Sequence, residues 1–137
     1  MTGNAATTEG LAPAARPPTI LIIDDDAAMR MILGLTLKGF GYLTLAAANG
    51  EDALQVARNH PQIGLIILDV VMAGLSGKKL ADQLQIDLPK AVILFCSGHP
   101  SETLPLHGID RDSIHFMQKP CRPLELQRKV QELLAIA

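Results

Sequence analysis

The sequence predicts an α/β domain built on a doubly wound, five-stranded parallel sheet. Five short apolar runs alternate with segments of helical pattern, and most of these runs are apolar throughout. Continuous apolar runs are typical of strands covered on both faces, as in a parallel sheet. Alternation with helices favours right-handed strand–helix–strand units with helices on both faces. The runs are residues 19–23, 42–47, 63–68, 91–96 and 113–118.

The first helix is predicted over residues 27–40. Asp26 is a suitable N-cap because its carboxylate can accept hydrogen bonds from the first free backbone N–H groups. Gly39 and Gly41 are typical of the end of a helix. We expect the core-facing side of this helix to contain Met29, Ile32, Leu33, Leu35 and Leu37.

Three further helices are predicted, over residues 50–60 after Asn49, over 77–87 and over 123–135. Residues 100–110 contain a proline and a glycine that permit only a short or distorted helix. The expected apolar stripes are Ala53, Leu54, Val56 and Ala57 in the helix after Asn49, and Leu124, Leu126, Val130, Leu133 and Leu134 in the last helix.

Composition narrows the class of protein. The 137 residues are near the usual size of one domain, and a net charge of −2 provides no basic surface for nucleic acid or for a membrane. No apolar run approaches a membrane span, and the N-terminus lacks the apolar core of a signal peptide. The two cysteines form no C-x-x-C pair, which favours reduced thiols in a cytoplasmic protein.

The chain divides into a short tail and one domain. Residues 1–18 are small, proline-bearing and almost free of large apolar side chains, so we expect a disordered tail or linker. Residues 19–137 form the predicted domain. The chain ends just after its last predicted helix, so we expect no output domain within it and signalling through a partner protein.

Charged and hydroxyl side chains follow four of the five predicted strands. Asp24 and Asp25 follow the first, Asp69 the third, Ser97 the fourth and Lys119 the fifth. The second strand contributes only alanines, as expected at a sheet edge. Because ligands of open α/β sheets bind at the carboxyl ends of the strands, we expect these side chains to meet at one site.

This set of groups suits magnesium and phosphoryl chemistry. Asp24, Asp25 and Asp69 offer the oxygen ligands that Mg²⁺ prefers, and Lys119 adds a positive charge. A carboxylate can also act as a nucleophile and form an aspartyl-phosphate. Ser97 could then donate a hydrogen bond to one phosphoryl oxygen, and Lys119 could pair with another.

Over essentially all of residues 19–137, the sequence resembles the receiver domain of bacterial response regulators. The family's acid pair is matched at 24–25, and its D-x-x-M-P-G-x-x-G pattern by DVVMAGLSG starting at Asp69. Its switch serine or threonine is matched by Ser97, and its Lys-Pro dipeptide by residues 119–120, at matching spacings. The stretch HGIDRDSIHFMQKPCRPLEL is most similar to receivers of hybrid sensor histidine kinases.

The resemblance implies a (βα)5 flavodoxin-like fold with strand order 2-1-3-4-5 and a role in two-component phosphorelay. Asp69 would accept phosphate from a histidine of a sensor kinase or histidine phosphotransfer protein, assisted by Ser97 and Lys119. The domain would signal to a downstream protein target. It would assist its own phosphorylation and dephosphorylation without being an enzyme in its own right.

The resemblance also implies a magnesium site. Asp25 and Asp69 would bind Mg²⁺ directly, together with the backbone carbonyl of Val71. Asp24 would reach the ion through water.

Further roles are implied for residues around this site. Phe116 matches the aromatic residue that changes rotamer when the family switches, and Val71 and His99 match positions that tune the lifetime of the phosphate. The chain departs from the family pattern at Ala73, where proline is usual, and at Cys121, where phenylalanine is common.

Two alternatives remain open from the sequence. A Mg²⁺-dependent phosphatase of the haloacid dehalogenase type would use a D-x-D motif, which Asp24 and Asp26 superficially satisfy, and would carry phosphate on Asp24 instead of Asp69. A degenerate receiver would bind partners without phosphorylation. The departures at Ala73 and Cys121 keep that second alternative open.

Overall fold

The structure, a computed structural model, describes residues 18–70, 77–98, 115–119 and 121–136. In these residues a five-stranded parallel sheet has the strand order β2-β1-β3-β4-β5, which confirms the predicted topology. Each strand lies within about two residues of its predicted range. The strands are β1 (Thr19–Ile23), β2 (Leu43–Ala47), β3 (Ile63–Asp69), β4 (Val92–Ser97) and β5 (His115–Gln118).

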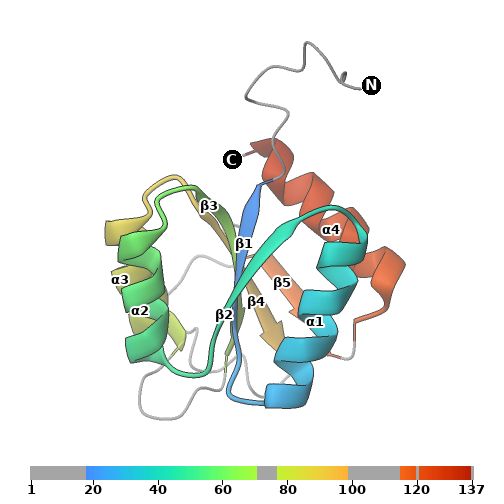
Figure 1. Ribbon diagram of the computed structural model, residues 1–137, viewed down its shortest axis with the longest axis horizontal. Helices are drawn as coiled ribbons and strands as arrows, with labels where there is room; N and C mark the ends of the chain where they lie inside the picture. Colours follow the sequence, from blue (N-terminus) through green and yellow to red (C-terminus); the bar gives the residue numbers. More distant parts are fainter. Residues whose placement is uncertain (1–17, 71–76, 99–114, 120, 137) are drawn as a thin grey trace.

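Helices cover both faces of the sheet, as predicted. In Figure 1, α1 and α4 lie on one face and α2 and α3 on the other. The predicted helix within 100–110 and residues 1–17 of the predicted tail lie outside the described residues. The helices are α1 (Ala27–Gly39), α2 (Gly50–Asn59), α3 (Gly77–Asp87) and α4 (Pro123–Ile136).

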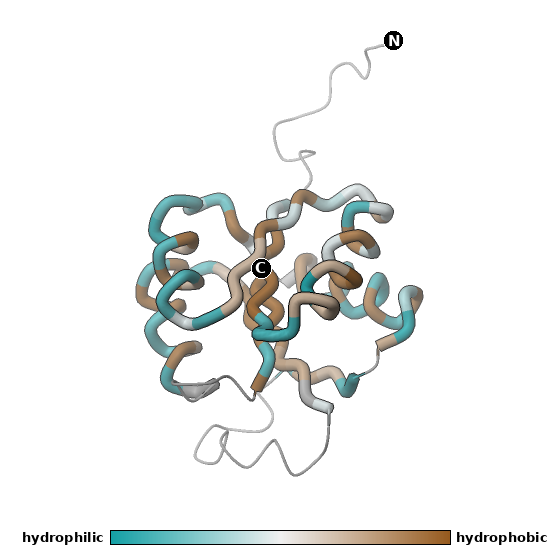
Figure 2. The backbone as a smooth tube through the Cα atoms, turned by 60° about the horizontal axis from the view of Figure 1, so that its bottom comes forward, coloured by the Kyte–Doolittle hydropathy of each residue, from teal (hydrophilic) through white to brown (hydrophobic). Residues whose placement is uncertain are grey.

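The central strands are buried on both faces. Every residue of β1 is buried, whereas most of edge strand β2 is partly or fully exposed. Alternate side chains of β1 enter two cores, Ile20 and Ile22 on the side of α1 and α4, and Leu21 and Ile23 on the side of α2 and α3. Burying one such side chain contributes about 1.5–3 kcal/mol. Figure 2 shows these hydrophobic strands between the two layers of helices.

The predicted core-facing side of α1 is only partly correct. Leu33 and Leu37 are buried, and Met29 packs against the core. Ile32 and Leu35 are 56% and 64% exposed. Each helical residue turns the side chain by about 100°, so Ile32 and Leu35 lie about 100° and 200° around the helix from Leu33 and cannot face the same sheet.

The other predicted stripes fit better. In α2, Ala53 and Ala57 are buried, and Leu54 and Val56 pack against them in part. In α4, Leu126, Val130 and Leu133 are buried and Leu134 is partly buried. The exception is Leu124, which is 72% exposed in the first turn of α4.

Local signals at the helix ends act as the sequence predicts. The Asp26 carboxylate accepts hydrogen bonds from the backbone N–H groups of Ala28 and Met29, and so caps α1. Gly41, just beyond α1, has a φ of 95°, a backbone conformation that favours glycine. The Asp26 cap starts α1 soon after β1 ends, so Asp24 and Asp25 lie in a short loop between the two elements.

Candidate functional site

Asp24, Asp69 and Lys119 lie at the carboxyl edge of the sheet and point to the same face. Successive side chains of an extended strand point to opposite faces, so a residue shares its face with the residue two positions earlier. Those earlier residues all belong to the core beneath α1 and α4. They are Ile22 in β1, Ile67 in β3 and Met117 in β5.

Lys119 joins two of the carboxylates. Its Nζ lies 2.8 Å from Oδ2 of Asp24 and 3.4 Å from Oδ2 of Asp69. The side chains of Lys119, Asp24 and Asp69 are 18%, 3% and 10% exposed. Buried carboxylates are costly unless paired, and Lys119 supplies the pairing. The predicted convergence of these three residues is therefore correct.

The pKa of Lys119 reflects this environment. Burial by itself lowers the pKa, but hydrogen bonding and charge from Asp24 and Asp69 outweigh it, so the pKa is raised above its ordinary value of 10.5. Lys119 is therefore a cation at neutral pH.

Asp24 is held at each of its polar atoms. Its backbone N–H donates to the carbonyl oxygen of Ala47 at 3.2 Å, and its Oδ1 accepts from the backbone N–H of Asp26 at 2.9 Å. Its carbonyl oxygen accepts from Nη1 of Arg30 at 2.8 Å. Sequence reasoning missed Arg30, although a cation in the first turns of a helix can reach back to the preceding loop.

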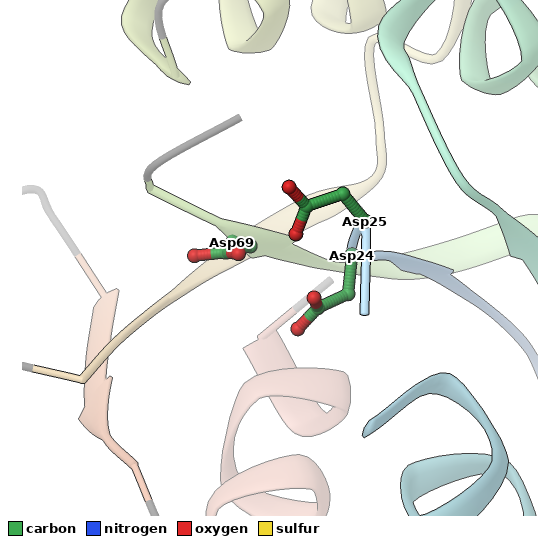
Figure 3. A group of neighbouring side chains, drawn as sticks. All are labelled: Asp24, Asp25 and Asp69. Carbon is green, nitrogen blue, oxygen red and sulfur yellow. The ribbon is translucent and has the colours of Figure 1, made fainter. Parts of the chain in front are cut away.

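Asp25 completes a group of three carboxylates. One oxygen from each of Asp24, Asp25 and Asp69 lies within 4.8 Å of the others. Figure 3 shows Asp24 and Asp25 on either side of the end of β1, with Asp69 beside them at the end of β3. Asp25 is exposed, unlike the other two.

This donor set fits a hard divalent cation. It consists of carboxylate oxygens alone, the ligands that Mg²⁺ prefers over nitrogen and sulfur ligands. Three negative charges face the two positive charges of Lys119 and Arg30, so the group keeps a negative excess. The three carboxylates therefore lie close enough together to hold a divalent cation, and Asp25 is the exposed member of the group.

The structure describes two of the remaining predicted site residues, Phe116 and Ser97. Phe116 is half-buried in β5 and packs on the α2 and α3 side of the sheet. Ser97 ends β4, where its backbone pairs with Gln118, and the predicted role of its hydroxyl group stays a prediction. Val71 and His99 lie outside the described residues.

The two cysteines carry no reactive signature. Cys96 is buried beside Asp69 in the sheet, and burial raises the pKa of its thiol to about 12. Cys121 is half-buried, and its pKa is also raised, mainly by burial. Both thiols are therefore protonated at neutral pH, and Cys96 serves as a packing residue of the core.

A parallel α/β sheet with an acid group and a lysine at its carboxyl edge is the arrangement that the sequence led us to expect of a receiver domain. The chain belongs to the response regulator receiver domain family, whose model matches residues 20–131. It is therefore a receiver domain of two-component signalling, a class that works with histidine kinases.

Individual relatives agree with this assignment. The chain is 31% identical over 121 residues to the phosphate regulon transcriptional regulatory protein PhoB of Pseudomonas aeruginosa, covering 85% of this chain and 51% of that protein. It is 30% identical over 115 residues to the alkaline phosphatase synthesis transcriptional regulatory protein PhoP of Bacillus subtilis, covering 84% and 48%. The chain thus spans about half the length of the curated relatives it matches.

Solved structures give the same fold. The receiver domain of the hybrid histidine kinase CckA matches with a TM-score of 0.72 and 31% identity, over 85% of this chain and 98% of that one. The chemotaxis protein CheY4 of Vibrio cholerae matches with a TM-score of 0.74 and 23% identity, over 85% and 98%, which supports the fold. The predicted likeness to hybrid-kinase receivers is confirmed by the first of these.

Among the described residues, no helix has the length and apolar character needed to cross a bilayer.

Proposed function

We propose that this receiver domain is a Mg²⁺-dependent phosphoacceptor in a phosphorelay, with Asp69 as the acceptor. One observation carries the proposal. Lys119 contacts both Asp24 and Asp69, while the exposed Asp25 shares a single group of carboxylates with them. Nucleophile, cation and metal ligands are thus within reach of one phosphoryl group.

Asp25 and Asp69 would bind Mg²⁺ directly, with the carbonyl of Val71 as a further ligand, and Asp24 would act through water. Bound Mg²⁺ would neutralise negative charge on the phosphoryl oxygens. The support for this assignment is the oxygen-only donor set and its negative excess.

The phosphoryl group would come from a phosphohistidine of a sensor histidine kinase or histidine phosphotransfer protein. A carboxylate oxygen of Asp69 forms a bond to phosphorus as the phosphorus–nitrogen bond breaks, and the electron pair of that bond returns to the imidazole ring. Lys119 lies beside Asp69 and can pair with a phosphoryl oxygen as negative charge arrives. Later hydrolysis of the aspartyl-phosphate would reset the domain.

The output would be a shift between two conformations. The phosphoryl group would attract the hydroxyl of Ser97, and Phe116 would change rotamer, so that a different surface meets a downstream protein target. Val71 and His99 would set the lifetime of the phosphate. We place this activity in the cytoplasm, without contact to nucleic acid or membrane, and regard the domain as an assistant to its own phosphotransfer and not as an independent enzyme.

The test is to incubate the protein with acetyl phosphate and Mg²⁺ and to measure its intact mass. We expect an adduct of about 80 Da, the mass of one phosphoryl group, as found on phosphorylated side chains. Asp69→Asn should lose the adduct. Asp82→Asn, which removes an exposed carboxylate from α3, should keep it.

Other outcomes separate the alternatives. An adduct that fragmentation places on Asp24 would favour the phosphatase. No adduct on folded wild-type protein would favour a degenerate receiver.

A further inference from the structure

Arg30 binds the backbone of the acid site and not one of its carboxylates. It is the fourth residue of α1, is half-buried, and follows the loop that carries Asp24 and Asp25. A guanidinium group normally prefers a carboxylate, with which it forms two charge-assisted hydrogen bonds. Here its Nη1 donates at 2.8 Å to a neutral acceptor, the backbone carbonyl oxygen of Asp24.

This carbonyl belongs to the peptide group that joins Asp24 to Asp25. A peptide group is planar, so holding its oxygen also holds its N–H and the Cα of the following residue. The peptide's preceding residue is fixed by Ala47, Asp26 and Lys119. The contact from Arg30 therefore extends this fixed region forward by one residue, to the exposed Asp25.

The two cations of the site act differently on its carboxylates. Lys119 binds carboxylate oxygens of Asp24 and Asp69 directly. Arg30 adds a positive charge but binds a backbone oxygen, so it takes no carboxylate oxygen that a metal would need. A residue that orders the loop in this way can support metal binding without competing for ligands.

We propose that Arg30 is a positioning residue, which holds the Asp24–Asp25 peptide so that the Asp25 carboxylate is pre-set to bind the divalent cation. This inference rests on the proposed function, because it assumes that the group of carboxylates binds Mg²⁺. It adds a residue of α1 that touches neither the metal nor the phosphoryl group. Residues that orient metal ligands affect affinity strongly although they do not bind the ion.

The test compares Arg30→Met and Arg30→Lys with the wild type, in the full chain. Lys38→Met is the matched control for Arg30→Met. Lys38 is an exposed cation in the last turn of the same helix. Mg²⁺ affinity is measured from amide chemical shifts during a MgCl₂ titration, and folding is checked by thermal melting in EDTA. We expect the dissociation constant to rise about tenfold in Arg30→Met and about threefold in Arg30→Lys, and to stay unchanged in Lys38→Met.

The sign of the change separates positioning from simple charge. If Arg30 acted only by its charge, its removal would relieve repulsion of Mg²⁺, and Arg30→Met would bind the ion more tightly. Tighter or unchanged binding by folded Arg30→Met overturns the proposal. If that variant does not fold, wild-type affinity in Arg30→Lys overturns it, because an ammonium group cannot reproduce the reach and planar geometry of the guanidinium.

The wild type distinguishes this failure from failure of the proposed function. If the wild type shows no saturable Mg²⁺ shift, the metal site itself is refuted. If the wild type binds Mg²⁺ and Arg30→Met binds it equally well, only the role of Arg30 is refuted.

Discussion

The acid site has two halves that differ sharply, although they begin with consecutive residues. In the closed half, Asp24 is buried, and all of its polar atoms have partners, among them Lys119. In the open half, Asp25 is exposed, and within the described part of the chain its carboxylate has no hydrogen bond or ion pair. The two side chains leave the chain on opposite sides just after β1, so Asp24 enters the core side and Asp25 faces solvent (Figure 3).

The difference separates two tasks that one carboxylate could not perform equally well. A carboxylate with fixed partners holds the loop and the lysine in place, but it is slow to accept a new ligand. An exposed carboxylate exchanges ligands freely but contributes little to stability. Variants of the closed half should therefore change mainly folding, and variants of the open half mainly metal binding.

Lys119→Met should have the largest effect. It leaves Asp24 buried without its cation, and removing one partner of a buried pair is strongly destabilising. The Lys119 side chain is 18% exposed, so water can reach the site and partly solvate the unpaired Asp24 carboxylate. We therefore expect the free energy of unfolding to fall by about 2 kcal/mol.

Urea denaturation without metal measures this effect. Lys38→Met, which removes an exposed cation, should stay within about 0.5 kcal/mol of the wild type. A stability of Lys119→Met equal to that of the wild type would show that the closed half does not depend on the ion pair.

Asp25→Asn should have the next largest effect, on metal binding. It removes a ligand charge from the open half, so we expect the dissociation constant for Mg²⁺ to rise about tenfold. Stability without metal should be unchanged or slightly higher, because one of three neighbouring negative charges is lost. A titration with MgCl₂ and a urea melt of the same sample test both statements, and a large loss of stability would contradict the division into two halves.

Alkaline pH should have the smallest effect. The pKa of Lys119 is raised in the folded state, so the stability it contributes is fully present below its unfolded pKa near 10.5 and is lost only as pH rises through the higher folded value. The stability difference between wild type and Lys119→Met should thus be constant from pH 7 to about 10 and shrink above that. Measuring both proteins at each pH isolates the contribution that depends on Lys119, including its effect on the neighbouring Cys96 thiol. A difference that shrinks below pH 9 would contradict the raised pKa of Lys119.

Much of the fold and site could be predicted because strand ends are easy to recognise. The apolar runs ended at Asp24, Asp69 and Lys119, and the carboxyl edge of a parallel sheet brings such residues together. The alternation of side chains then dictates which of them share a face. Both steps require only the positions of residues along each strand.

Two features could not be predicted, because they depend on the rotation of a helix against the sheet and on the direction of a long side chain. Ile32 and Leu35 are apolar, which is typical of core residues, yet they are exposed because the sheet covers only one side of α1. The contact of Arg30 with a backbone oxygen has no sequence signature, since the same side chain could have paired with a carboxylate. A long side chain beside a loop can reach several hydrogen-bond acceptors, and the three-dimensional arrangement determines which of them it binds.

The ion pair between Asp24 and Lys119 has a consequence for the rate of unfolding. The two residues are 95 positions apart, one after the first strand and the other after the last, and β3 and β4 lie between their strands. A contact between positions so far apart in the sequence carries a large loop-closure cost, so we expect it to form late in folding. Lys119→Met should therefore speed unfolding and leave the folding rate nearly unchanged, and a slowed folding limb in stopped-flow urea jumps would show that the pair forms early.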